Sequence, residues 1–236
     1  MADLSRRGKH ILVVDDDPEL QLFLRRDLEL EGYVVLLAAD GAEAVASVRT
    51  AHPDLVVLDL VLPVMDGFTA LHAMREVSAV PIIVLTARDA EDDKLQALHL
   101  GADGYVTKPF RPQVLLARIE NVLRRSTRAG SSSQEPLVVD EDLTIDFARN
   151  RVILRGTEQP LTATEYRLLA QLVSNAGHVL PTEVVLARVW GADYREEVHY
   201  VRLYVSYLRA KIEPDPAHPR YILTEKGLGY RFIDLS

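Results

Sequence analysis

The chain of 236 residues contains no cysteine and no long uninterrupted apolar segment. Without cysteine, neither a disulfide framework nor a thiolate metal site can form. No apolar run approaches the roughly 18 residues that span a bilayer. The polar segment 1–9, and the apolar stretch that stops at Asp15, do not have the form of a signal peptide. These absences favour a cytoplasmic protein with no membrane partner.

Basic residues are outnumbered, because 27 Lys and Arg oppose 35 Asp and Glu, for a net charge of -8. An acidic protein is an unexpected partner for nucleic acid. The charge is unevenly distributed, however: residues 1–135 hold 21 acidic and 15 basic residues, whereas residues 199–231 hold three acidic and six basic ones. Local charge decides where a phosphate backbone binds, so the net charge does not exclude DNA binding near the C-terminus.

Residues 1–125 alternate between short apolar runs and amphipathic segments. Such runs are typical of strands buried on both faces of a parallel sheet. We expect strands at 10–14, 34–38, 54–59, 81–86 and 104–107, and helices at 18–31, 41–51, 66–76, 90–100 and 111–125. Five β–α repeats predict a doubly wound α/β domain, for which we assume the strand order 2-1-3-4-5. In that order strands one and three are neighbours, and ligands of such folds bind at their carboxyl ends.

A small, polar stretch at 126–135 predicts a flexible linker between a domain at 1–125 and a domain at 136–236. In the second domain, short β-like stretches near 137–160 precede three helical patterns. These patterns lie at 162–175, 182–190 and 196–212, and two further strand-like stretches lie at 221–224 and 230–233. Three helices closed by a hairpin predict an α+β winged helix-turn-helix domain.

Four of the predicted strands end at polar side chains with useful chemistry. These are Asp15 and Asp16 after the first strand, Asp59 at the end of the third, Thr86 at the end of the fourth and Lys108 at the end of the fifth. Mg²⁺ prefers oxygen ligands, and close carboxylates relieve their mutual repulsion by binding a cation. The candidate metal ligands are therefore Asp15, Asp16, Asp59 and the backbone carbonyl of Val61.

A carboxylate in such a site can also attack phosphorus and form an acyl phosphate. Asp59 is the best candidate because it stands alone at its strand end, and Lys108 can pair with the phosphoryl group. Taken one at a time, these residues have ordinary explanations. Asp17 before Pro18 has the form of a helix N-cap, and Thr86 can cap the helix that follows it. Their occurrence at four different strand ends favours the functional interpretation.

Residues 10–125 resemble the receiver domain of two-component response regulators. The resemblance rests on Asp15-Asp16, on Asp59 followed by Leu60-Val61-Leu62-Pro63 and Asp66-Gly67, on Thr86-Ala87, on Gly101-Ala102-Asp103 with Tyr105, and on Lys108-Pro109-Phe110. It implies Mg²⁺-dependent phosphoryl transfer from a partner histidine kinase to Asp59. It also implies that Thr86 moves toward the phosphoryl group while Tyr105 turns inward, and that the Lys108-Pro109 peptide bond is cis.

Residues 161–233 resemble the winged-helix effector of the OmpR/PhoB subfamily, through the stretch 161–169, Val189-Trp190-Gly191, Leu208-Arg209-Ala210-Lys211 and the stretch 227–232. The resemblance implies that helix 196–212 is the recognition helix for promoter DNA and that the hairpin turn is the wing. On a helical wheel the core stripe is Val198, Val201, Val205, Leu208 and Ile212. The candidate DNA contacts are His199, Tyr200, Arg202, Leu203, Ser206, Tyr207, Arg209 and Lys211 on the helix, and Thr224 and Lys226 in the turn.

The chain departs from the subfamily at Gly104 and Val114, where acidic residues are usual. Those acids commonly pair with bases equivalent to Lys94 and Arg118 across a dimer. We still expect a homodimer on phosphorylation, with an incomplete set of interface salt bridges, and RNA polymerase is a further expected partner. The segments 199–204 and 215–220 are similar to those of regulators of potassium-transport operons.

These observations predict a transcription factor controlled by phosphorylation, and not an enzyme. One alternative is a metal-dependent phosphatase with an aspartyl-phosphate intermediate. Such enzymes generally place the nucleophile after the first strand, whereas Asp59 follows the third. A second alternative is a receiver with a protein-binding output, in which the winged helix docks on another protein.

Overall fold

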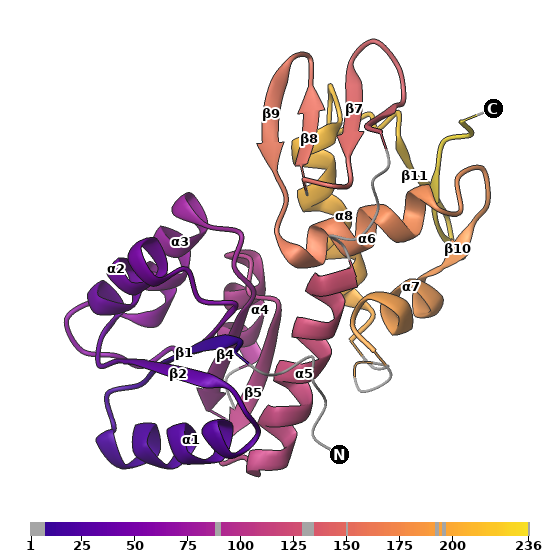
Figure 1. The fold of residues 1–236 in the computed structure, drawn as a ribbon. Helices are drawn as coiled ribbons and strands as arrows, with labels where there is room; N and C mark the ends of the chain where they lie inside the picture. Colours follow the sequence, from indigo (N-terminus) through magenta and orange to yellow (C-terminus); the bar gives the residue numbers. More distant parts are fainter. Residues whose placement is uncertain are drawn as a thin grey trace. The chain divides into compact units, whose positions relative to one another are not determined.

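The computed structural model of the chain describes residues 8–87, 91–128, 135–149, 151–191, 194 and 197–235. The chain divides into two compact units, Met1–Ser126 and Thr127–Ser236. Figure 1 draws the first unit from indigo to magenta and the second from salmon to yellow.

The first unit contains a five-stranded parallel sheet. Its strands are β1 (His10–Val14), β2 (Val34–Ala38), β3 (Leu55–Asp59), β4 (Ile82–Ala87) and β5 (Gly104–Lys108). Their order is β2-β1-β3-β4-β5, and every neighbouring pair is parallel. The order expected from the sequence is confirmed, and β1 and β3 are neighbours.

Five helices connect or follow these strands: α1 (Pro18–Leu30), α2 (Gly41–Ala51), α3 (Gly67–Val77), α4 (Glu91–His99) and α5 (Pro112–Arg128). Aspartates define where the first three begin. The Asp17 carboxylate accepts from the backbone N–H of Glu19 and Leu20, as expected of an N-cap. Asp40 and Asp66 do the same for α2 and α3.

Apolar side chains cover both faces of the sheet. On one face Ile11, Val57 and Ile83 pack with residues of α1 and α5 in a single buried cluster. On the other face Leu12, Val56 and Val84 are also fully buried. Figure 1 shows α1 on the opposite side of the sheet from α2 and α3. Burial on both faces explains the nearly continuous apolar runs, and it leaves the strand ends as the place for polar chemistry.

Helix α5 is longer than predicted. It continues to Arg128, so the first three residues of the expected linker are helical. Residues 129–134 of that stretch lie outside the described residues. The prediction placed the boundary too early because Ser126 and Thr127 have weak helix propensity, which an established helix overrides.

The second unit begins with an antiparallel sheet, in the order β6 (Leu137–Val138), β7 (Leu143–Asp146), β8 (Arg151–Leu154), β9 (Thr157–Pro160). Next come α6 (Ala163–Val173), β10 (Leu180–Pro181), α7 (Thr182–Val189), α8 (His199–Ile212), β11 (Ile222–Glu225) and β12 (Gly229–Phe232). The last three-stranded sheet has the order β10-β12-β11. Three helices closed by a hairpin form the predicted winged-helix arrangement.

Helix α8 begins at His199. The predicted start at 196 lies outside the described residues, and residues 197 and 198, which were also expected to be helical, precede the helix. Its buried side includes Val201, Val205, Leu208 and Ile212, which confirms the central part of the predicted stripe. Val198 instead precedes the helix and is only partly buried. Among the described residues, no helix is both long enough and apolar enough to cross a membrane.

The loop between β3 and α3 contains a strained residue. Val64 has a φ of 64° and is 89% exposed. The Met65 N–H donates to the Pro63 carbonyl at 2.6 Å, which closes a three-residue turn around Val64. A β-branched side chain at positive φ is disfavoured by roughly 1–2 kcal/mol, because its Cβ crowds the backbone carbonyl.

Val64→Gly is expected to stabilise the first unit by about 0.5–1 kcal/mol, since relief of strain exceeds the entropic cost of glycine. Calorimetry should show the melting transition of this unit rise by roughly 2–4 °C. Val64→Ala is the matched control, because it removes the same exposed apolar group but keeps a Cβ. Equal shifts for the two variants would contradict the strain explanation.

Candidate functional site

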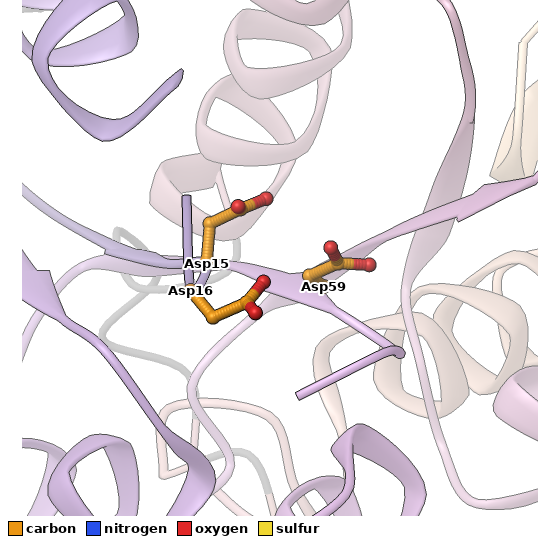
Figure 2. A group of neighbouring side chains, drawn as sticks. All are labelled: Asp15, Asp16 and Asp59. Carbon is orange, nitrogen blue, oxygen red and sulfur yellow. The ribbon is translucent and has the colours of Figure 1, made fainter. Parts of the chain in front are cut away.

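Three carboxylates from two neighbouring strands meet at one edge of the parallel sheet. Asp15 and Asp16 directly follow β1, and Asp59 is the last residue of β3. Each offers an oxygen within 4.8 Å of those of the other two. Figure 2 shows the side chains around the ends of these strands. Asp15 and Asp59 are buried, with 1% and 6% of their surface exposed, whereas Asp16 is exposed.

Lys108 at the end of β5 joins the two buried carboxylates. Its ammonium donates to Asp59 Oδ2 at 2.5 Å and to Asp15 Oδ2 at 2.8 Å. The Lys108-Pro109 peptide bond that follows is cis, as expected from the sequence. The structure thus brings together side chains from three strands that lie far apart in the chain.

Burial shifts the pKa values of the side chains in this site. It raises the pKa of Asp59 above the ordinary aspartate value, although the Lys108 ammonium and the Val61 N–H both act to lower it. The Val61 N–H donates to Asp59 Oδ1 at 3.3 Å. For Lys108, burial acts to lower the pKa, but the hydrogen bonds to Asp15 and Asp59 outweigh it, and the pKa is raised. Lys108 therefore remains a cation beside the carboxylates.

Two further residues hold this edge in place and were not predicted from the sequence. The Gln21 side-chain amide on α1 donates to the carbonyls of Asp15 and Ala38, both at 2.7 Å, and so ties the ends of β1 and β2 together. Gly67 lies so close to the backbone of Asp59 and Leu60 that a Cβ would clash with it. The signal for Gly67 was present in the Asp66-Gly67 motif, but nothing in the sequence pattern pointed to Gln21.

Thr86 and Tyr105 lie on the neighbouring strands β4 and β5. Thr86 is 3% exposed, and its hydroxyl has no hydrogen-bond partner among the described residues. The Tyr105 ring is partly buried, and the Lys94 ammonium lies 5.3 Å from its centroid. The expected movement of Thr86 and Tyr105 stays a prediction.

Six of the predicted DNA-contacting residues lie at least partly on the surface of α8 or of the hairpin turn. His199, Arg202 and Ser206 are exposed on α8, Leu203 beside them is partly exposed, and Thr224 and Lys226 are exposed in the hairpin. The spacing of the α8 residues by three and four places them on one outward side of the helix.

Three other predicted DNA contacts do not present their polar groups outward. Tyr200 is 1% exposed and packs against Trp190 and Tyr194, with ring centroids 6.4 Å and 5.8 Å away. Lys211 donates to Glu165 Oε2 at 2.6 Å and to the Pro160 carbonyl at 3.0 Å. The structure thus places Tyr200 on the core side of α8 and pairs the partly exposed Lys211 with the buried Glu165. Their role as DNA contacts stays a prediction.

Tyr207 is the third predicted DNA contact whose polar group is not directed outward, because its hydroxyl is buried. Burial, aided by the charge of Glu165, raises the pKa of Tyr207 well above its ordinary value. Its ring meets that of Tyr204 edge to face at 5.6 Å. The wheel placed Tyr207 on the outer side of α8, but contacts with neighbouring elements turn its hydroxyl inward.

Comparison with known proteins identifies both units. Residues 11–120 match the response regulator receiver domain family, and residues 156–232 match the family of C-terminal domains of transcriptional regulatory proteins. The chain is a response regulator of the OmpR/PhoB type. It is thus a two-component protein with a DNA-binding domain.

Individual relatives cover nearly the whole regulator. The transcriptional regulatory protein KdpE of Mycobacterium tuberculosis is 43% identical over 94% of this chain and 98% of its own length. The KDP operon transcriptional regulatory protein KdpE of Escherichia coli is 45% identical over 95% and 99%. A solved structure of a RitR mutant superposes with a TM-score of 0.82 at 28% identity, over 96% of this chain and all of that one.

The pKa of Asp59 generates a stability prediction for the metal-free regulator. Because its folded-state pKa is raised, the stability that this carboxyl contributes is present at low pH and is lost as pH rises through that pKa. Asp59→Asn should therefore increase the free energy of unfolding of the receiver near neutral pH. The gain should shrink as pH falls toward 3.8, the ordinary aspartate value.

Asp66→Asn is the control of opposite sign. Hydrogen bonds from the Thr69 hydroxyl and N–H lower the pKa of Asp66, so its ionised form stabilises the fold above the ordinary pKa. This variant should lower stability near neutral pH. Thermal unfolding in the presence of a chelator, followed across pH, measures both. Changes of the same sign would refute the protonation argument.

Proposed function

We propose that this regulator accepts a phosphoryl group on Asp59 from a sensor histidine kinase, with Mg²⁺ bound, and that this modification controls its binding to promoter DNA. The observation that carries the proposal is the convergence of Asp15, Asp16, Asp59 and Lys108 at one end of the sheet. No other group of three metal-ligating side chains occurs among the described residues.

The donor set suits a hard divalent cation. Asp15, Asp16 and Asp59 supply carboxylate oxygens within 4.8 Å of one another, and Asp16 is open to solvent. We propose these three and the carbonyl of Val61 as the residues that hold Mg²⁺. When bound, the cation neutralises charge on the phosphoryl oxygens.

The chemistry of the chain's own residues follows from their positions. An Asp59 carboxylate oxygen attacks phosphorus, the P–O bond forms, and the P–N bond of a phosphohistidine donor breaks with its electron pair returning to the imidazole. Lys108 stays protonated beside Asp59 and balances the added negative charge. The buried Thr86 hydroxyl, which has no partner among the described residues, is available to donate to the new phosphoryl oxygens.

The DNA-binding output is proposed for the exposed side of α8 and for the hairpin turn. His199 and Arg202 provide donors on a helix that can enter the major groove, and Lys226 provides a cation at the turn. The exposed Ser206 hydroxyl donates to the Leu203 carbonyl at 2.6 Å and can accept a hydrogen bond. Leu203 and Thr224 complete this proposed DNA face. The name of the Escherichia coli relative supports a KDP operon as the kind of operon that this regulator controls.

We also propose that phosphorylation promotes a homodimer and that RNA polymerase is a downstream partner. Lys94, Tyr105, Val114 and Arg118 line one hollow formed by α4, β5 and α5, which suits a contact surface. Val114 is 48% exposed, so an apolar group stands where an acid is usual in the subfamily. The apolar side chain at position 114 supports a dimer interface that is more apolar and has fewer ion pairs between the two copies.

Asp59→Asn is expected to abolish phosphoryl incorporation from a cognate kinase or a small phosphodonor with Mg²⁺. Lys108→Met should slow incorporation by roughly a hundredfold, because a donor to the developing charge is lost. Intact-protein mass spectrometry measures the product. Asp17→Asn, which keeps the N-cap of α1, is the control and should be labelled normally. Normal labelling of Asp59→Asn would overturn the proposal.

Arg202→Ala is expected to weaken binding to a target promoter by roughly 5- to 100-fold, the range for loss of a base-contacting arginine. Arg49→Ala removes the same charge from an exposed position on α2 and should leave affinity unchanged. Fluorescence anisotropy at fixed salt measures both, because affinity depends steeply on ionic strength. Equal effects of the two substitutions would mean that α8 does not provide the DNA face.

A further inference from the structure

Strand β11 of the hairpin has a strand partner on one side only. In the order β10-β12-β11 it stands at the edge of its sheet and pairs with β12 alone. The backbone groups on its other edge need partners from elsewhere, because unpaired backbone donors and acceptors are costly when buried. Tyr221 and Ile222, at the start of this edge, are fully buried.

Two side chains from the end of α8 satisfy that edge. The Arg209 guanidinium donates through Nε and Nη2 to the Ile222 carbonyl, at 3.1 Å and 2.6 Å. The Glu213 carboxylate accepts from the backbone N–H of Arg220, Tyr221 and Ile222, with shortest distances of 2.7, 3.0 and 2.8 Å. Arg209 and Glu213 are four residues apart, so they project along one side of the helix end. Together they bind the N–H and the C=O of Ile222 as a neighbouring strand would.

Arg209 also reaches further along the hairpin. Its Nη2 donates to the Thr224 hydroxyl at 2.8 Å, and its guanidinium carbon lies 6.0 Å from the centroid of the Tyr230 ring. Thr224 is two residues from Lys226 in the turn. One side chain of α8 therefore contacts both strands of the hairpin that carries the wing.

We propose that Arg209 is a positioning residue for DNA binding. It sets the hairpin, and with it Lys226, at a fixed place relative to the exposed side of α8, and it does not itself contact DNA. The inference rests on the proposed DNA face, and it replaces the expectation from sequence that Arg209 binds DNA directly. Its donors Nε and Nη2 are already directed at Ile222 and Thr224.

A double-mutant cycle tests this role in the full-length regulator. Lys226→Ala should weaken promoter binding by roughly three- to tenfold in the wild-type background, as expected for loss of one cation near the DNA backbone. In the Arg209→Met background the same change should weaken binding by less than about twofold, because the hairpin is no longer held in place. Contacting or coupled residues show such non-additivity, whereas independent ones do not.

Arg202→Met is the matched comparison, since Arg202 is an exposed arginine on the same helix. Its effect should add to that of Lys226→Ala. If Arg209→Met and Lys226→Ala are also additive, Arg209 acts as an independent DNA contact and the proposal is overturned. Should Arg209→Met fail to fold, the cycle is run with Arg209→Lys, which keeps the charge and one donor and should give intermediate coupling.

Amide hydrogen exchange of the free regulator supplies a readout that does not depend on DNA. Arg209→Met should speed exchange in β11 and at the hairpin turn while α8 stays protected. Unchanged exchange in β11 would also overturn the proposal. If Lys226→Ala has no effect on the wild type, the proposed wing contact fails by itself, and the exchange experiment then decides the role of Arg209.

Discussion

The receiver depends on one arrangement of charge: two buried carboxylates held beside a single ammonium where three strands end. Asp15 and Asp59 come from neighbouring strands and repel each other, and burial makes that repulsion expensive. Lys108 at the end of β5 compensates for it, because its ammonium donates to both carboxylates. A site balanced in this way responds strongly to any added charge, which is the property that a covalent or ionic switch requires.

Both units hold their functional surfaces with side chains that bind the backbone of another element. In the receiver, the Gln21 amide joins the ends of β1 and β2 through the backbone carbonyls of Asp15 and Ala38. In the winged-helix unit, Arg209 and Glu213 join the end of α8 to the edge of β11. Such hydrogen bonds fix the relative position of elements more closely than apolar packing alone, because they are directional.

The position of the proposed nucleophile separates this regulator from phosphatases that form an aspartyl phosphate. The candidate phosphoacceptor ends β3, and the two aspartates after β1 are proposed cation ligands. The relatives over nearly the full length are named as transcriptional regulators, and the second unit matches a transcriptional regulatory domain. The acidic net charge is no obstacle to this output, since basic residues gather near the C-terminus and the exposed Arg202 and Lys226 are among them.

The sequence by itself determined where the five strands lie, which polar residues end them, and the central part of the apolar stripe of α8. These features depend on the periodicity of short segments, which is a local property of the chain. The strand order was an assumption until the tertiary structure fixed it, and with it the convergence of Asp15, Asp59 and Lys108. Only the tertiary structure decided that Lys211 turns to Glu165, that Tyr200 packs on Trp190, and that Arg209 binds the edge of β11. A helical wheel gives the direction of a side chain's first bond, but partners distant in sequence decide where a long polar side chain ends.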